Sequence, residues 1–175
     1  GKLVSKPVHQ LIEVNNLKPS VTLVTLGITP VEDLQAKLTE LPPSGGLKLK
    51  VGHSGSKAMI MAVKQLDPRP IFLDANQGLQ TVAQAVDLAE ADDDRLIGIE
   101  QPFTVNDRLM QRDLQRRLEA CIYGDESIQN LIQLEQVAGI FNGVNIKLIK
   151  CGGLDRAKAM ADRAVELGMK VMLGS

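Results

Sequence analysis

The stretch Ile71-Phe72-Leu73-Asp74-Ala75-Asn76 is apolar until it reaches an acidic residue, and its apolar part has the length of one buried β-strand. The same pattern recurs in Leu96-Ile97-Gly98-Ile99-Glu100 and in Cys121-Ile122-Tyr123-Gly124-Asp125. Continuous apolar runs are typical of strands in a parallel sheet, because both faces of such a sheet are covered. The three stretches therefore predict consecutive, fully buried parallel strands.

Seven such runs occur along the chain, and the segments between them have helical periodicity. The last of these segments, 154–167, is alanine-rich and is followed by Gly168, where we expect its helix to end. Unbroken alternation of strand and helix is typical of a parallel sheet covered by helices. The predicted strands are 21–27, 47–51, 70–74, 95–100, 120–125, 144–149 and 170–174.

Polar residues near the predicted strand ends recur about every 25 residues: Lys50, Asp74, Glu100, Asp125 and Lys147 are separated by 24, 26, 25 and 22 positions. This repeat suits a (β/α)8 barrel, which typically needs about 200 residues. The 175 residues account for seven units, and an eighth strand is not visible. We therefore expect an α/β fold, an incomplete (β/α) barrel, with an open doubly wound sheet as the alternative.

The first residues differ from the repeating part of the chain. Segment 1–16 has the apolar spacing of a short helix, and 15–19 is a plausible linker, so we expect a lead-in at 1–16 and the barrel at 17–175. The sequence starts at glycine and stops on an apolar run, and we expect it to be part of a longer protein.

The composition is that of an ordinary globular domain, with 44% hydrophobic and 23% charged residues, and it excludes collagen-like, disordered and disulfide-rich classes. A net charge of −1 favours neither nucleic acid nor a membrane surface as partner. No apolar run approaches the roughly 20 residues of a bilayer span, and no leader opens the chain. Cys121 and Cys151 lack zinc-site spacing and are expected to be buried thiols in the cytoplasm.

Asp74, Glu100 and Asp125 each follow a predicted strand. A single acidic residue at such a place is more often a loop or capping residue. The carboxyl ends of barrel strands meet at one rim, however, so three of them would converge and repel one another unless a cation neutralises them. Because carboxylate oxygens suit Mg²⁺, we predict a magnesium site.

Lysines flank these carboxylates on the predicted strands. Lys48 and Lys50 share one strand face, as do Asn145 and Lys147. A lone Leu-Lys-Leu-Lys is most often a solvated strand face, but in a barrel strand two lysines fit only near the rim. Lys50 and Lys147 would lie opposite each other, which suits proton removal from one face of a carbon and delivery to the other. A neighbouring cation would lower the lysine pKa from about 10.4.

The motifs together resemble the enolase superfamily, in its muconate-lactonizing-enzyme subgroup, and most of all the dipeptide epimerases of the L-Ala-D/L-Glu type. Thr25-Leu26-Gly27-Ile28 and Lys150-Cys151-Gly152-Gly153 are weaker supporting features. The motifs that carry the resemblance are Lys48-Leu49-Lys50, Asp74-Ala75-Asn76, Glu100-Gln101-Pro102, Gly124-Asp125-Glu126-Ser127 and Asn145-Ile146-Lys147-Leu148.

The resemblance implies an isomerase in which Asp74, Glu100 and Asp125 coordinate Mg²⁺. Lys50 and Lys147 would be the acid/base catalysts of a 1,1-proton transfer through a metal-stabilised enediolate, with Lys48 assisting Lys50. The substrate would be a dipeptide or another small carboxylate. Residues that would orient these groups or contact the substrate, with turn or capping roles as the alternative, are Thr25, Asn76, Glu126, Ser127 and Asn145.

The family pattern is incomplete in this sequence. Members carry an N-terminal capping domain, of which 1–10 resembles only the connecting tail, and dipeptide epimerases have an eighth strand whose Asp-x-Asp holds the substrate ammonium. Sister subgroups use a histidine base, but neither His9 nor His53 follows a strand suitably, which favours two-lysine chemistry.

Several alternatives stay open at this point. An o-succinylbenzoate synthase, an N-acylamino-acid racemase or a muconate-type cycloisomerase would use the same lysines and metal. A non-catalytic barrel fragment, or a metal-binding scaffold that works only with a partner supplying the rest, would show a concentration-dependent oligomer and no turnover. A homo-oligomer also stays open. An unrelated flavodoxin-like binding domain would leave Asp74 and Lys147 far apart.

Overall fold

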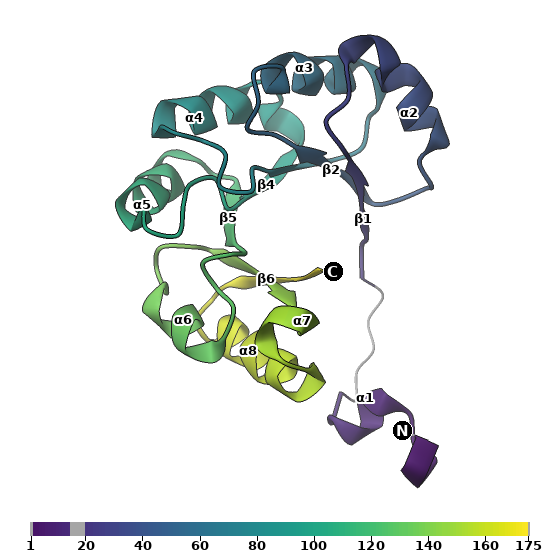
Figure 1. Cartoon of the computed structure of the whole chain (residues 1–175), viewed down its shortest axis with the longest axis vertical. Coiled ribbons are helices and arrows are strands. Elements are labelled where there is room, and N and C mark those ends of the chain that lie inside the picture. Colours follow the sequence, from purple (N-terminus) through teal and green to yellow (C-terminus); the bar gives the residue numbers. More distant parts are fainter. Residues whose placement is uncertain (1, 15–19, 175) are drawn as a thin grey trace.

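The computed structural model describes residues 2–14 and 20–174. Its strands form one parallel sheet in the order β1-β2-β3-β4-β5-β6-β7, which curls into an open barrel with β1 and β7 at its edges (Figure 1). This sequential order confirms the predicted incomplete barrel and excludes the doubly wound and flavodoxin-like alternatives. The strands are β1 Leu23–Leu26, β2 Gly46–Lys50, β3 Ile71–Asp74, β4 Leu96–Glu100, β5 Cys121–Gly124, β6 Gly143–Lys147 and β7 Lys170–Gly174.

Helices α2 to α6 and α8 lie outside the curled sheet and cover its outer face, whereas α1 lies apart from it (Figure 1). Helix α4 begins with a capping box, in which the Thr81 hydroxyl accepts from the Gln84 N–H and the Gln84 side chain accepts from the Thr81 N–H. The α-helices are α1 Val8–Leu11, α2 Leu34–Glu40, α3 Ser56–Leu66, α4 Val82–Glu90, α5 Arg108–Arg117, α6 Leu131–Gln136, α7 Leu148–Cys151 and α8 Leu154–Glu166, and 3-10 turns span Lys2–Val4, Val31–Asp33 and Asp93–Arg95.

The large core lies between the sheet and the helices, and a small second cluster fills the inside of the curl. In this inner cluster Phe72 and Tyr123 pack edge to face, with ring centroids 5.1 Å apart, beside Cys121. Two glycines make room for the rings: a Cβ on Gly98 would lie 2.8 Å from the Phe72 ring, and one on Gly143 would lie 2.5 Å from the Tyr123 ring. The aromatic pair therefore forms a packed floor below the carboxyl ends of the strands.

The structure corrects the predicted sixth strand. β6 ends at Lys147, and Leu148 and Ile149 begin the short helix α7, where both are exposed. Gly152, with φ of 87°, ends that helix in the left-handed region that glycine adopts most easily. The last predicted helix ends before Gly168 as expected.

Other expectations have mixed outcomes. Cys121 and Cys151 are buried free thiols, as predicted. Within 2–14 the lead-in forms a 3-10 turn and α1, neither of which buries a residue, and the predicted linker at 15–19 lies outside the described residues. None of the helices within 2–14 and 20–174 combines the length and apolar character that a membrane crossing requires.

The packed floor makes a stability prediction. Gly98→Ala places a methyl group against the Phe72 ring and the Cys121 carbonyl oxygen, so we expect the free energy of unfolding in urea to fall by about 1–3 kcal/mol. Gly27→Ala is the matched control, because its new methyl group meets nothing within 4 Å, and its effect should stay within about 0.5 kcal/mol. Equal effects of the two substitutions would contradict this description of the barrel interior.

Candidate active site

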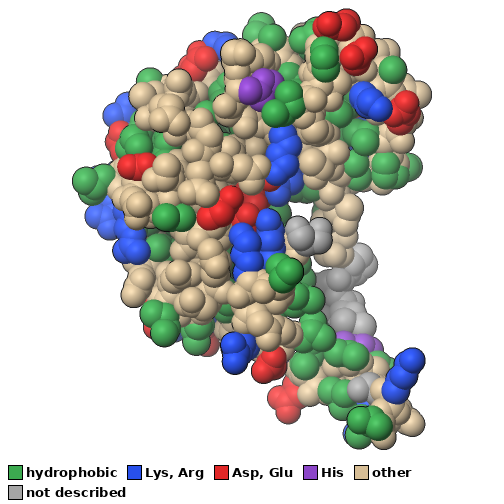
Figure 2. Space-filling model, in the orientation of Figure 1, with side chains coloured by type: hydrophobic (Ala, Val, Ile, Leu, Met, Phe, Trp, Pro, Cys, Tyr) green, Lys and Arg blue, Asp and Glu red, His purple; other side chains and the backbone are tan. Residues whose placement is uncertain are grey.

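A cavity of about 630 Å³ lies between the edge strands β1 and β7 of the curled sheet and extends from Val21 and Ile97 to the lysines at the carboxyl ends of the strands. Parallel register brings the functional positions together, because Lys50 pairs with Asp74 and Asp74 pairs with Glu100. Acidic and basic side chains lie side by side at the middle of this face (Figure 2). The sequence-predicted residues that line the cavity are Thr25, Lys48, Lys50, Asp74, Asn145 and Lys147.

The β2–β4 side of the site is an ion-pair cluster around two carboxylates. The Lys48 Nζ lies 2.9 Å from the Asp74 Oδ2 and 2.7 Å from the Glu100 Oε2. The Lys50 Nζ lies 2.7 Å from the same Asp74 oxygen and donates to the Asn76 Oδ1 at 2.6 Å. Asp74 and Glu100 are buried, so these ammonium groups are the nearest compensation for their charge.

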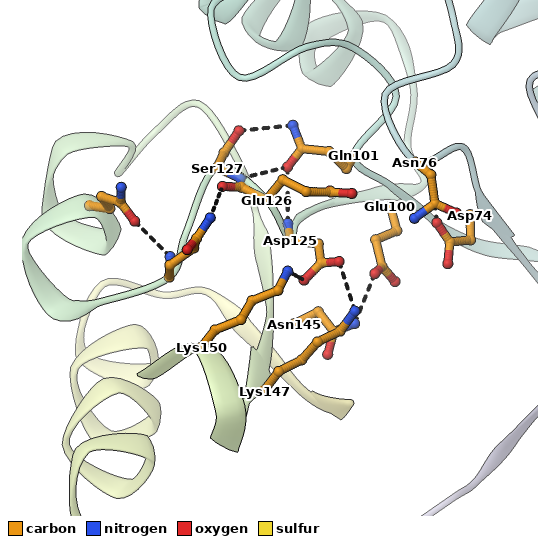
Figure 3. A network of polar contacts seen from close by, with 12 residues as sticks. Asp74, Asn76, Glu100, Gln101, Asp125, Glu126, Ser127, Asn145, Lys147 and Lys150 are labelled. Carbon is orange, nitrogen blue, oxygen red and sulfur yellow. Dashed lines mark hydrogen bonds and ion pairs between the residues drawn. The ribbon is translucent and has the colours of Figure 1, made fainter. Parts of the chain in front are cut away.

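The β5–β6 side is built around Asp125, which is buried directly after β5. Its two carboxylate oxygens accept from different lysines, Oδ2 from Lys147 at 2.9 Å and Oδ1 from Lys150 at 2.6 Å. The Asn145 Nδ2 donates to the Glu100 Oε1 at 2.8 Å and so connects the two sides (Figure 3). The network thus runs from β2 to α7.

Burial and ion pairing act in opposite directions on the pKa values of Glu100, Asp125 and Lys48. Burial, together with the nearby Asp74 charge, raises the pKa of Glu100 despite its bonds to Lys48 and Asn145. Burial acts in the same sense on Asp125, but hydrogen bonds from Lys150 and Lys147 outweigh it and lower the pKa of Asp125. Burial lowers the pKa of Lys48, yet its bonds to Glu100 and Asp74 prevail and the pKa is raised.

The residues fit a magnesium ion by donor chemistry. Asp74, Glu100 and Asp125 supply only oxygen donors and come from neighbouring strands, and the buried Asn145 Oδ1 is a further oxygen without a hydrogen-bond partner among the described residues. Within 2–14 and 20–174, however, no three acidic, cysteine or histidine side chains are grouped closely enough to hold a metal. Instead of the expected close convergence around one cation, each carboxylate is paired with lysine ammonium groups, and Lys48 pairs with two carboxylates.

The remaining predicted residues fall into two groups. Asn76 and Ser127 take part in the network, Asn76 through Lys50 and Ser127 through the Gln101 side chain. Thr25 is exposed on β1 at the cavity, and the Glu126 Oε2 is buried without a partner among the described residues.

Sequence reasoning missed two residues, Gln101 and Lys150, although both stand inside motifs that it used. Lys150 comes three positions after Lys147, a spacing that brings both to one carboxylate only because α7 replaces the predicted end of the strand. Gln101 directly follows the buried end of β4, whose second residue Ile97 is exposed, and is itself fully buried, which is unusual for a glutamine. Their position next to predicted ligands is the signal that could have identified them.

Comparison with known proteins places this arrangement in a family. The chain matches the family described as enolase C-terminal domain-like over residues 37–175. It is 32% identical to the L-Ala-D/L-Glu epimerase of Bacteroides thetaiotaomicron over 99% of the chain and 46% of that protein. It is 33% identical to the L-Ala-D/L-amino acid epimerase of a Maribacter species over 99% of the chain and 51% of that protein.

Two further proteins extend this comparison: a relative that catalyses a different reaction, and a dipeptide epimerase of known structure. The o-succinylbenzoate synthase of Bacillus subtilis is 29% identical over 86% of the chain and 42% of that protein. The dipeptide epimerase of Enterococcus faecalis, solved with Mg and the dipeptide L-Leu-L-Tyr, superposes with a TM-score of 0.78 at 27% identity, covering 88% of the chain and 46% of that structure. The chain spans about half the length of the curated relatives it matches. The chain therefore belongs to the enolase superfamily, and residues 37–175 correspond to the C-terminal domain of its members.

Proposed function

We propose that this chain carries the catalytic site of a Mg²⁺-dependent dipeptide epimerase that acts by 1,1-proton transfer on substrates of the L-Ala-D/L-Glu type. The observation that carries the proposal is the placement of Lys50 and Lys147 on β2 and β6, with three buried carboxylates on the strands between them. The epimerase activities of the Bacteroides and Maribacter relatives support the choice of reaction.

The proposed domain organisation follows from the lead-in segment. Residues 1–16 would come from the connection to a capping domain, and 17–175 would form the barrel. In support, the 3-10 turn Lys2–Val4 and α1 bury no residue, and the matched relatives are about twice as long as this chain. The buried free thiols of Cys121 and Cys151 favour a cytoplasmic location.

Asp74, Glu100 and Asp125 would hold the metal ion. When bound, Mg²⁺ would neutralise the negative charge that develops on the substrate carboxylate as the α-proton leaves, and without such compensation that proton is too weakly acidic for an amine. Buried, hydrogen-bonded carboxylates on three neighbouring strands are held in place before any ligand arrives, which lowers the cost of assembling the site.

Lys50 and Lys147 would exchange the proton at the α-carbon. A general base takes the proton from one face and the opposing lysine, as general acid, returns one to the other face, so a stereocentre is inverted without net chemical change. The Asn76 Oδ1 orients the Lys50 Nζ, and Lys48 adds a positive charge on the same side through its bonds to Asp74 and Glu100. Both proposed catalytic side chains line the cavity between β1 and β7, so a substrate in that cavity could reach them.

The competing reaction is o-succinylbenzoate synthesis, which the similarity to the Bacillus subtilis enzyme favours specifically. It would use the same lysines and metal, so substrate tests must separate the two. N-acylamino-acid racemisation and muconate-type cycloisomerisation share this chemistry and belong in the same test panel.

Proton exchange tests the reaction directly. We expect the chain with Mg²⁺ in D₂O to lose the α-proton NMR signal of one residue of L-Ala-L-Glu or a related dipeptide, and Lys147→Ala to slow this at least 100-fold, because acid/base groups contribute roughly 10²–10⁴-fold. Lys158→Ala, which removes a lysine paired with Asp162 on the surface of α8, should leave the rate unchanged. Exchange only in N-acylamino acids, or turnover only of the o-succinylbenzoate precursor, would reassign the substrate, and no exchange in any panel member would refute the proposal.

Thermal unfolding tests the metal assignment. Mg²⁺ should raise the melting temperature, since a ligand at 100 times its Kd stabilises a protein by about 2.7 kcal/mol, and a chelator should reverse the change. Asp125→Asn should remove most of the response, whereas Asp162→Asn, at a surface ion pair, should retain it. A chain that folds but shows no response to Mg²⁺ would contradict the assignment of these carboxylates as ligands.

A further inference from the structure

Gln101 occupies an unusual backbone conformation at the end of β4, directly after Glu100. Its φ is 37°, in the left-handed region that side chains with a Cβ seldom adopt, and such strain persists only where the surroundings hold it. The Gln101 N–H donates to the Tyr123 carbonyl at 2.9 Å, and the Gln101 carbonyl accepts from the Gln77 N–H at 2.8 Å. Its backbone is therefore fixed between the neighbouring strand ends.

The Gln101 side chain is fully buried and uses every hydrogen-bonding position of its amide. The Oε1 accepts from the Asp125 N–H at 3.1 Å and the Ser127 N–H at 3.0 Å. The Nε2 donates to the Ser127 Oγ at 2.8 Å and to the Phe103 carbonyl at 3.0 Å. Figure 3 shows how this amide reaches from the end of β4 to the loop that follows β5.

These bonds make the location of Asp125 depend on Gln101, the residue that follows Glu100. Glu100 precedes Gln101 in the chain, and Asp125 is held by the Gln101 amide through its backbone N–H. We propose that Gln101 is a positioning residue, which fixes the Asp125 backbone and so holds the start of its side chain at the rim beside the end of β4, where the proposed function would use Glu100 and Asp125 as ligands. The metal-related part of this inference rests on the proposed function, whereas the positioning itself does not.

Gln111 on α5 provides a matched control for a purely structural role. It is also buried, and its Nε2 donates to the same Phe103 carbonyl, at 3.1 Å. Its Oε1 has no hydrogen-bond partner among the described residues, and no bond links its side chain to the loop that contains Asp125. Replacement of either glutamine thus removes a buried amide and one bond to Phe103, but only Gln101 holds Asp125.

The test compares Gln101→Met and Gln111→Met in the whole chain, first without metal and then by Mg²⁺ titration. Without metal, hydrogen exchange at the Asp125 and Ser127 amides should accelerate at least 10-fold in the Gln101→Met chain and less than 2-fold in the Gln111→Met chain. Gln101→Glu keeps an acceptor in place of Oε1 and should retain most of the protection at both amides. In the titration, Gln101→Met should weaken Mg²⁺ binding by roughly 10–100-fold, and Gln111→Met should change it less than about 2-fold.

The outcomes separate this inference from the proposed function. If the unmodified chain binds no Mg²⁺, the metal assignment fails, while exchange at the Asp125 amide still decides whether Gln101 positions that residue. Equal losses of Mg²⁺ affinity in the two methionine variants would show a packing effect and overturn the inference. Unchanged exchange at the Asp125 amide in the Gln101→Met chain would overturn it as well. If that variant does not fold, loss of protection at both amides in the Gln101→Glu chain, which keeps the acceptor, would overturn it.

Discussion

Three carboxylates buried at neighbouring strand ends are the constraint on which the site depends. An uncompensated buried charge costs several kcal/mol, so Asp74, Glu100 and Asp125 require positive groups within bonding distance. β2 supplies two lysines to Asp74 and Glu100, and β6 and α7 supply one each to Asp125. The change from strand to helix after Lys147 contributes to this compensation, because it brings Lys150 to the second carboxylate oxygen of Asp125.

The aromatic floor below the rim sets the environment in which these charges act. Phe72 and Tyr123 fill the inside of the curl, and Gly98 leaves the space that their rings occupy. The Lys48 Nζ lies 5.8 Å from the Phe72 ring centroid, within the range of a cation–π contact. An apolar floor on one side strengthens the ion pairs above it, since less water is available to screen them.

The sequence predicts the order of the strands and the residues at their ends because apolar runs that stop at a polar residue define both. It does not predict where β6 ends, since Leu148 and Ile149 are apolar and suit a strand or a helix equally by periodicity. The pairing of each carboxylate with lysines depends on side-chain reach across strands, and the role of Gln101 depends on a left-handed backbone that no local pattern indicates for glutamine. These features arise from tertiary contacts, whereas the carboxylate and lysine positions themselves follow from the strand pattern.

Under the proposed function, the ion pairs also connect metal binding with acid/base chemistry. Lys50 and Lys147, the two residues proposed to move the proton, are bonded to Asp74 and Asp125, which are also proposed as metal ligands. A carboxylate oxygen that coordinates a cation has less capacity to accept from an ammonium group, so occupation of the metal site and freedom of the lysines belong to one equilibrium. Lys48 and Asn145 keep Glu100 in place during such an exchange, because their bonds to it involve neither catalytic lysine. Under the proposed function the same carboxylates would thus both bind the metal ion and determine when the two lysines are free to move a proton.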